Sequence, residues 1–122
     1  MLIRAGTRRT SRLVPDGSLT KESEYMLLER SEISVRLGTE QEFLTVMQDK
    51  GVPILTSFPG VLNVDLGQGV ENSDKFLFLV EWKSLDDHAA FNQHEVHDTF
   101  LALFAPYAVG GAMEHFQIFP AG

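Results

Sequence analysis

The chain has 122 residues, of which 43% are hydrophobic and 22% charged, as in one ordinary globular domain. The formal net charge is −7, and residues 25–122 carry five cations against fourteen acids. A phosphate backbone would be repelled by that charge, so we expect no nucleic-acid partner. No apolar run approaches the ~18 residues of a membrane span, so a membrane partner is not expected either. The chain has no cysteine, which excludes disulfides and thiolate sites and fits a cytoplasmic location.

The first residues differ in composition from the remainder. Residues 1–15, "MLIRAGTRRTSRLVP", contain four arginines and no acid, a composition shared by organelle transit peptides. Gly6 and Pro15 interrupt a helical pattern, so a disordered arm, an arm packed on a partner subunit, or a start site further along the chain are alternatives. We assign residues 1–24 to an extended or disordered N-terminal arm and residues 25–122 to the folded domain.

Residues 26–37, "MLLERSEISVRL", mostly alternate between apolar and polar side chains and predict a half-buried strand. One face of this strand carries the apolar residues Leu27, Ile33, Val35 and Leu37. Glu29 and Ser31 lie on the same face. Because a carboxylate that faces a core is costly without a partner, we expect Glu29 at the strand end or beside a wet cavity.

The next elements follow from spacing and turn residues. Apolar side chains at helical spacing predict a helix from Thr39 towards Leu55, which Gly51 and Pro53 are expected to kink or end. A turn, a second strand, a hairpin loop and a third strand are then predicted at residues 58–60, 61–67, 68–74 and 75–82.

A second helical region begins after Ser84, breaks near Asn92 and Gln93, and runs to about Tyr107. "MEHFQIF" at residues 113–119 closes the chain as a fourth strand. The order β-α-β-β-α-β predicts an α+β, ferredoxin-like split βαβ fold, with a four-stranded antiparallel sheet and two helices on one face.

The third strand predicts a partner. Residues 76–80 are apolar on both faces of the strand, although two helices cover only one face of the sheet. A second copy of the chain would cover the other face. We therefore expect a homodimer packed sheet on sheet.

Four segments taken together resemble the antibiotic biosynthesis monooxygenase family. They are "EISVRLGTEQEFL", "FPGVLNVDLG", "KFLFLVEWKSLDDHAAFNQHEVHDTF" and "MEHFQIF". The resemblance covers about residues 25–120 and implies a dimeric α+β barrel with a pocket between sheet and helices. It also implies oxidation of quinols or polycyclic phenols with O₂, and no cofactor: no flavin, no haem and no metal.

Two related branches fit less well. Relatives that degrade haem use an Asn, a Trp and a His, and the corresponding positions here are Ser31, Phe91 and Leu101, so a haem site is not expected. Polyketide cyclases carry a His-x-x-His at the place of "HEVH" and pair the second His with a Tyr six residues upstream. Here that residue is Phe91, so the resemblance transfers only His97.

Three histidines lie within residues 82–100. A metal site would need His94, His97 and a third ligand from Glu29, Glu81 or His115, and the resemblance implies none. His97 instead borders the apolar stripe of its helix, where an imidazole suits proton transfer inside a cavity. His88 is expected on a solvated helix face or hydrogen-bonded to a loop carbonyl, and His115 is expected in the pocket or at the dimer seam.

The leading prediction is a cofactor-independent monooxygenase acting on a quinol-like or polycyclic phenolic substrate. Its alternatives are a ligand-binding or stress-response barrel without turnover, and a cyclase using His97. The predicted catalytic residues are His97, Ser31 and Asn92. The predicted substrate-binding residues are Glu29, Trp82, Phe91, His94 and His115, with Trp82 either a core residue or an aromatic platform.

Overall fold

The structure, a computed structural model, describes residues 2–5 and 26–119. Within these residues five strands form one antiparallel sheet in the order β1-β3-β4-β2-β5. The strands are β1 (Leu2–Ala5), β2 (Met26–Val35), β3 (Val61–Gln68), β4 (Lys75–Trp82) and β5 (Ala108–Ile118). Without β1, the order β3-β4-β2-β5 is that of the ferredoxin-like fold, so the predicted fold class is confirmed.

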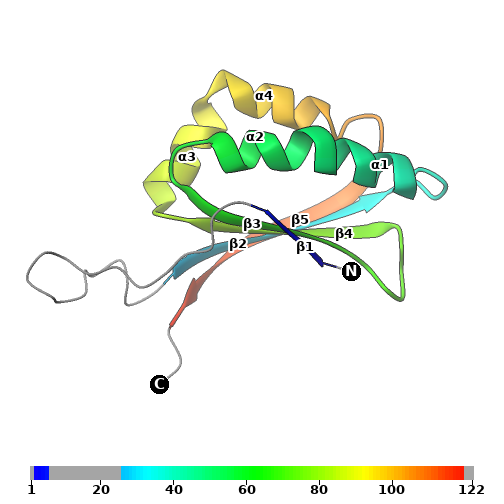
Figure 1. The fold of residues 1–122 in the computed structure, drawn as a ribbon, viewed down its shortest axis with the longest axis horizontal. Helices are drawn as coiled ribbons and strands as arrows, with labels where there is room; N and C mark the ends of the chain where they lie inside the picture. Colours follow the sequence, from blue (N-terminus) through cyan, green and yellow to red (C-terminus); the bar gives the residue numbers. More distant parts are fainter. Residues whose placement is uncertain (1, 6–25, 120–122) are drawn as a thin grey trace, which may run out of the picture.

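The helices of the described residues all lie on one face of the sheet (Figure 1). They are α1 (Glu40–Val46), the π-helical segment η2 (Met47–Gly51), α2 (Val52–Ser57), α3 (Leu85–Gln93) and α4 (Glu95–Ala102). The first three form one continuous helical segment, and the last two are separated by the extended residue His94. The predicted division of the second helical region is therefore confirmed.

The first helical segment does not end at Gly51 and Pro53. It passes through η2 and continues as α2, in which Pro53 occupies the first turn, where its missing N–H is tolerated. A Cβ on Gly51 would lie 2.8 Å from Sδ of Met47, so the glycine allows the π-helical turn to pack closely. The interruption expected here is thus a local change of helical pitch.

The N-terminal residues add a strand that the predicted four-stranded sheet lacks. β1 pairs antiparallel with β3, with Leu2 opposite Gly67 and Ala5 opposite Val64. Most of the predicted N-terminal arm, residues 6–24, lies outside the described residues. At the other end of the chain, β5 begins at Ala108 rather than at the predicted Met113.

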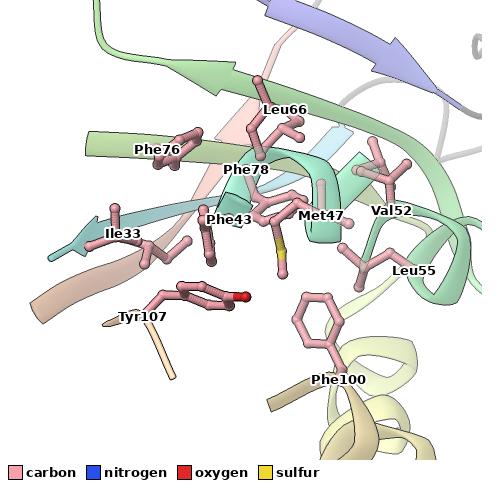
Figure 2. Packing of buried hydrophobic residues seen from close by; sticks show 14 of the residues in the cluster. Ile33, Phe43, Met47, Val52, Leu55, Leu66, Phe76, Phe78, Phe100 and Tyr107 are labelled. Carbon is pink, nitrogen blue, oxygen red and sulfur yellow. The ribbon is translucent and has the colours of Figure 1, made fainter. Parts of the chain in front are cut away.

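The core lies between the helices and the sheet. Phe43 and Met47 of the first helical segment are fully buried against Phe76, Phe78 and Leu66 of the sheet (Figure 2). Their packing follows the predicted spacing of apolar residues in both layers. Leu37 was expected on the apolar face of β2 but follows the strand in a turn and is 80% exposed.

The opposite face of the sheet is uncovered by helices in the described part of the chain (Figure 1). On β4, Phe76, Phe78 and Val80 face the helices and are buried, whereas Leu77 and Leu79 point the other way and are half-buried. None of the helices described is long and apolar enough to cross a membrane.

Candidate active site

A cavity of about 540 Å³ lies between the α3–α4 pair and the helix-facing side of the sheet. Its apolar wall includes the aromatic residues Phe78, Phe91, Phe100 and Phe104. Its polar lining consists of Glu29, Ser31, His88, Asn92 and His97. Cavities of small-molecule sites combine a largely apolar wall with a few polar groups in this way.

The alternation of β2 explains two of these polar groups. Glu29 and Ser31 share the strand face that points towards the helices, as the sequence predicted. The other groups come from the two helices: His88 and Asn92 from α3, and His97 from α4. Because the chain turns at His94, both helices present polar side chains to the same cavity.

Glu29 is a buried carboxylate with partners. Its side chain lies on the cavity wall, and Trp82 donates a hydrogen bond from Nε1 to Oε1 of Glu29 over 2.9 Å. Nε2 of His88 lies 3.2 Å from the same oxygen. Burial raises the pKa of the Glu29 carboxyl, while the Trp82 hydrogen bond and the nearby His115 and His97 lower it.

The position of His88 differs from the one predicted from the sequence. It was expected on a solvated helix face, but it is 5% exposed and stacks on Trp82, with ring centroids 4.6 Å apart. Its Nδ1 lies 2.6 Å from Nε2 of His115. Burial lowers the pKa of His88 to about 4, with smaller contributions from His115 and His97, so the ring is neutral at pH 7.

The sequence contained a signal for this position. His88 precedes Phe91 by three residues, and residues at that spacing share one face of a helix. Because Phe91 is a large apolar residue, this shared face indicates that His88 is buried beside it.

The predicted catalytic residues His97, Ser31 and Asn92 all line the cavity, as do the predicted binding residues Glu29 and Phe91. The His97 ring meets the Phe91 ring edge-on, with centroids 5.2 Å apart. The structure thus brings these side chains together, and their roles in chemistry stay predictions.

Three predicted binding residues lie behind or beside the cavity. Trp82 is 1% exposed and is covered by His88. His94 caps α4, because its Nδ1 accepts a hydrogen bond from the Val96 N–H over 3.0 Å. His115 lies on the exposed strand β5 and contacts the cavity through His88.

The metal ligands considered from the sequence do not converge as a set. Instead, Glu29, His88 and His115 each offer one atom within 4.8 Å of the other two. This group has the residue types of a two-histidine, one-carboxylate site. The same contacts also form a chain of hydrogen bonds from Glu29 through His88 to His115.

The comparisons with known proteins agree with the fold. The family model described as "Antibiotic biosynthesis monooxygenase" matches residues 26–103. The uncharacterized protein YczJ of Bacillus subtilis is 31% identical over 94 residues, which cover 75% of this chain and 98% of that protein.

Solved structures extend the likeness to the whole domain. A protein from Bordetella bronchiseptica, proposed to be an antibiotic biosynthesis monooxygenase, has a TM-score of 0.69 at 23% identity, covering 78% of this chain and 98% of its own. A conserved protein from Methanosarcina mazei has a TM-score of 0.68 at 14% identity, covering 78% and 94%. With more than half of its residues matched by the family model, the chain belongs to the antibiotic biosynthesis monooxygenase family.

Proposed function

We propose that this protein is a cofactor-independent monooxygenase that oxidises a quinol-like or polycyclic phenolic substrate with O₂. The proposal rests on one observation: the cavity has an aromatic wall and a polar lining that includes His97, Asn92, Ser31 and Glu29. Its volume of about 540 Å³ lies within the range of ~300–1,000 Å³ typical of small-molecule sites. Family membership and the monooxygenase neighbour support the same reaction class.

The chemistry needs a base, a cavity shielded from bulk water and an electron-rich substrate. His97 removes the phenolic proton, and the resulting anion passes one electron to O₂. The substrate radical and superoxide combine to a peroxide anion, which takes up one proton to become a hydroperoxide and then loses water to leave a carbonyl. One substrate CH₂ and one O₂ thus give one C=O and one H₂O, with no external reductant.

The remaining side chains orient the substrate. The Asn92 amide donates a hydrogen bond to a substrate oxygen, and the Ser31 hydroxyl contacts the same polar edge. Phe91 and its aromatic neighbours pack on the flat ring system. This wall keeps bulk water away from the anion, which bulk water would otherwise solvate and make slower to oxidise.

The proposal is tested by O₂ consumption with a panel of hydroquinones and anthrones. Replacing His97→Ala is expected to lower the rate by about 10²–10⁴-fold, the usual contribution of a general acid/base. Thr99→Ala, on the exposed side of the same helix, is the matched control and should retain the rate. Ligand binding without O₂ consumption would indicate a binding barrel, and product formed without O₂ would indicate a cyclase.

We also propose that the active form is a homodimer packed through the helix-free face of the sheet. Leu77 and Leu79 lie at the centre of that face and are only half-buried in the single chain. Burial of ~600 Å² of such surface per subunit would contribute on the order of 15 kcal/mol before the costs of association.

Solution mass tests the dimer. The wild-type protein should have twice the chain mass of 13.6 kDa in light scattering, and Leu79→Asp should reduce it to a single chain. Leu85→Asp, which places the same charge on an exposed leucine at the start of α3, is the control and should leave the dimer intact. A monomeric wild type would refute the proposal.

A further inference from the structure

We propose that Glu29, His88 and His115 form a proton relay between the cavity and the exposed edge of the sheet. The inference rests on the proposed function, because the proton it carries is the one removed from the substrate. It assigns His88 and His115 a role in proton exchange that is separate from the role of His97.

The distances define a linear chain. Oε1 of Glu29 lies 3.2 Å from Nε2 of His88, and Nδ1 of His88 lies 2.6 Å from Nε2 of His115. Each contact uses a different ring nitrogen of His88, so the imidazole connects its two neighbours. Both distances fall within the range of hydrogen bonds.

The two ends of the relay differ in exposure to solvent. Glu29 and His88 are 9% and 5% exposed and lie on the cavity wall. His115 lies on β5, whose residues are exposed along nearly the whole strand in the described chain. A proton that passes from Glu29 to His115 therefore moves from the cavity to solvent.

Backbone pairing and contacts with Trp82 hold the three groups in place. Glu29 and His115 are direct cross-strand partners in the β2–β5 register. His88 stacks on Trp82 with an angle of 22° between the rings, and Trp82 also donates to Glu29. The chain is thus formed before any substrate arrives, as efficient proton transfer requires.

The same geometry disfavours a metal ion. An ion bound at about 2.1 Å from each ligand atom needs those atoms to lie roughly 3 Å apart, with a single nitrogen of each histidine pointing at the ion. The His88 nitrogen near Glu29 is not the nitrogen near His115, so one ion cannot use both short contacts. One atom from each residue lies within 4.8 Å of the other two, but such a set contains at most one of the two short contacts of His88.

In each step of the relay, one proton moves across one hydrogen bond. The proton removed by His97 reaches Glu29 through a water in the cavity. Glu29 then protonates Nε2 of His88, His88 gives its Nδ1 proton to Nε2 of His115, and His115 releases its Nδ1 proton to solvent. No electron moves along the chain, and one proton leaves for each proton removed from the substrate.

The direction reverses later in the same turnover. The peroxide anion requires a proton to become the hydroperoxide, and this proton returns by the same steps in the opposite order. The overall oxidation neither consumes nor releases a net proton, so this return restores the starting tautomers. The titratable groups that face His88 are Glu29 from β2, His115 from β5 and His97 from α4.

The first experiment is independent of activity. Nitrogen-15 NMR of the histidine rings in the full-length protein should show His88 neutral near pH 7. Titration of His115 should change the ring signals of His88, and Glu29→Gln should alter both. Independent titration of the two rings would overturn the relay.

The second experiment uses turnover. His115→Gln should lower the rate by about tenfold or more and increase its solvent isotope effect, and added imidazole should restore the rate. Glu114→Gln, the adjacent residue on β5, is the control. A rate unchanged in His115→Gln, or a loss that imidazole does not restore, would contradict the relay.

Two further outcomes separate the relay from a metal site and from a failure of the proposed function. Stoichiometric binding of Zn²⁺ or Co²⁺ that disappears in Glu29→Gln would overturn the relay in favour of a metal site. If no substrate in the panel consumes O₂, the proposed function fails while the NMR titration still decides whether the three groups are coupled.

Discussion

The two halves of the space between helices and sheet differ in how they are filled. Under the first helical segment, Phe43, Met47 and Val64 are completely buried and the interior is solid. Under α3 and α4, the same layer contains a partly open cavity of about 540 Å³ with carboxylate, imidazole and amide groups on its wall. We call these the packed half and the hollow half.

The contrast has a cause in the chain. The first helical segment runs without a break across the sheet, so large apolar side chains reach β3 and β4. The second region is divided at His94, and β2 opposes it with Glu29 and Ser31. Stability should therefore depend mainly on the packed half and chemistry on the hollow half, and the predictions below test this division.

The largest effect is expected in the packed half. Phe43 contacts the rings of Phe76, Phe104 and Tyr107 at centroid distances of 4.8–5.7 Å. Phe43→Ala should lower the free energy of unfolding by about 3–5 kcal/mol, measured in urea, because the cavity it leaves cannot collapse. Leu101→Ala, which removes a 49% exposed cavity residue, should cost less than about 1 kcal/mol. Equal losses would refute the division.

The next largest loss of stability is expected where the turn before β3 contacts α3. Gly60 precedes β3 with φ of +93°, and a Cβ there would lie 2.5 Å from Cβ of Asp87 in α3. Gly60→Ala should therefore cost about 2 kcal/mol or more from strain and steric overlap together.

Gly38→Ala is the matched control for Gly60→Ala. Gly38 has nearly the same φ, +94°, but a Cβ there would meet nothing within 4 Å. Strain alone should cost about 1 kcal/mol. Thermal unfolding of both variants measures the difference, and identical losses would show that contact with Asp87 is unimportant.

Much of the fold was predictable because it depends on local periodicity. The alternation in β2 and β4 and the helical spacing around Phe43 indicate their elements without long-range information. The length of β5 was not predictable, since Gly110 and Gly111 normally interrupt a strand. Pairing with β2 fixes these glycines in place, and a Cβ on Gly111 would lie 2.7 Å from the Glu32 carbonyl oxygen.

The site was predictable only in part. The alternation of side chains along β2 predicted that Glu29 and Ser31 share the helix-facing side, and helical spacing predicted that His97 lies near the apolar stripe. The pairing of His88 with His115 depends on how α3 crosses the sheet, and a single sequence does not specify that crossing. Likewise, His94 resembled a pocket residue in sequence but serves as the N-cap of α4.

A smaller effect is expected from pH in the hollow half. The pKa of His88 is lowered to about 4 from 6.5, so the unfolded chain binds more protons between these values. Its contribution to stability is therefore present above pH 6.5 and is lost as the pH falls towards 4. The raised pKa of Glu29 acts in the opposite sense as the pH falls towards 4.5 and reduces the net loss.

Comparison with His88→Gln isolates this contribution. Between pH 7 and pH 5, the wild-type free energy of unfolding should fall by on the order of 1–2 kcal/mol more than that of His88→Gln. Urea unfolding at the two pH values gives the measurement. Parallel losses in both proteins would mean that His88 titrates as it does in the unfolded chain.

The smallest effect on stability should accompany a large effect on activity. Glu29→Gln retains an oxygen that accepts from Trp82 Nε1 and removes the cost of burying a carboxylate, while weakening the contact with His88. These terms oppose each other, so the free energy of unfolding at pH 7 should change by no more than about 1 kcal/mol. O₂ consumption should nevertheless fall by about 100-fold, because an amide cannot exchange protons with the cavity. A loss of ~3 kcal/mol in stability with the rate retained would make Glu29 a structural residue, and the hollow half would then differ from the packed half only in density.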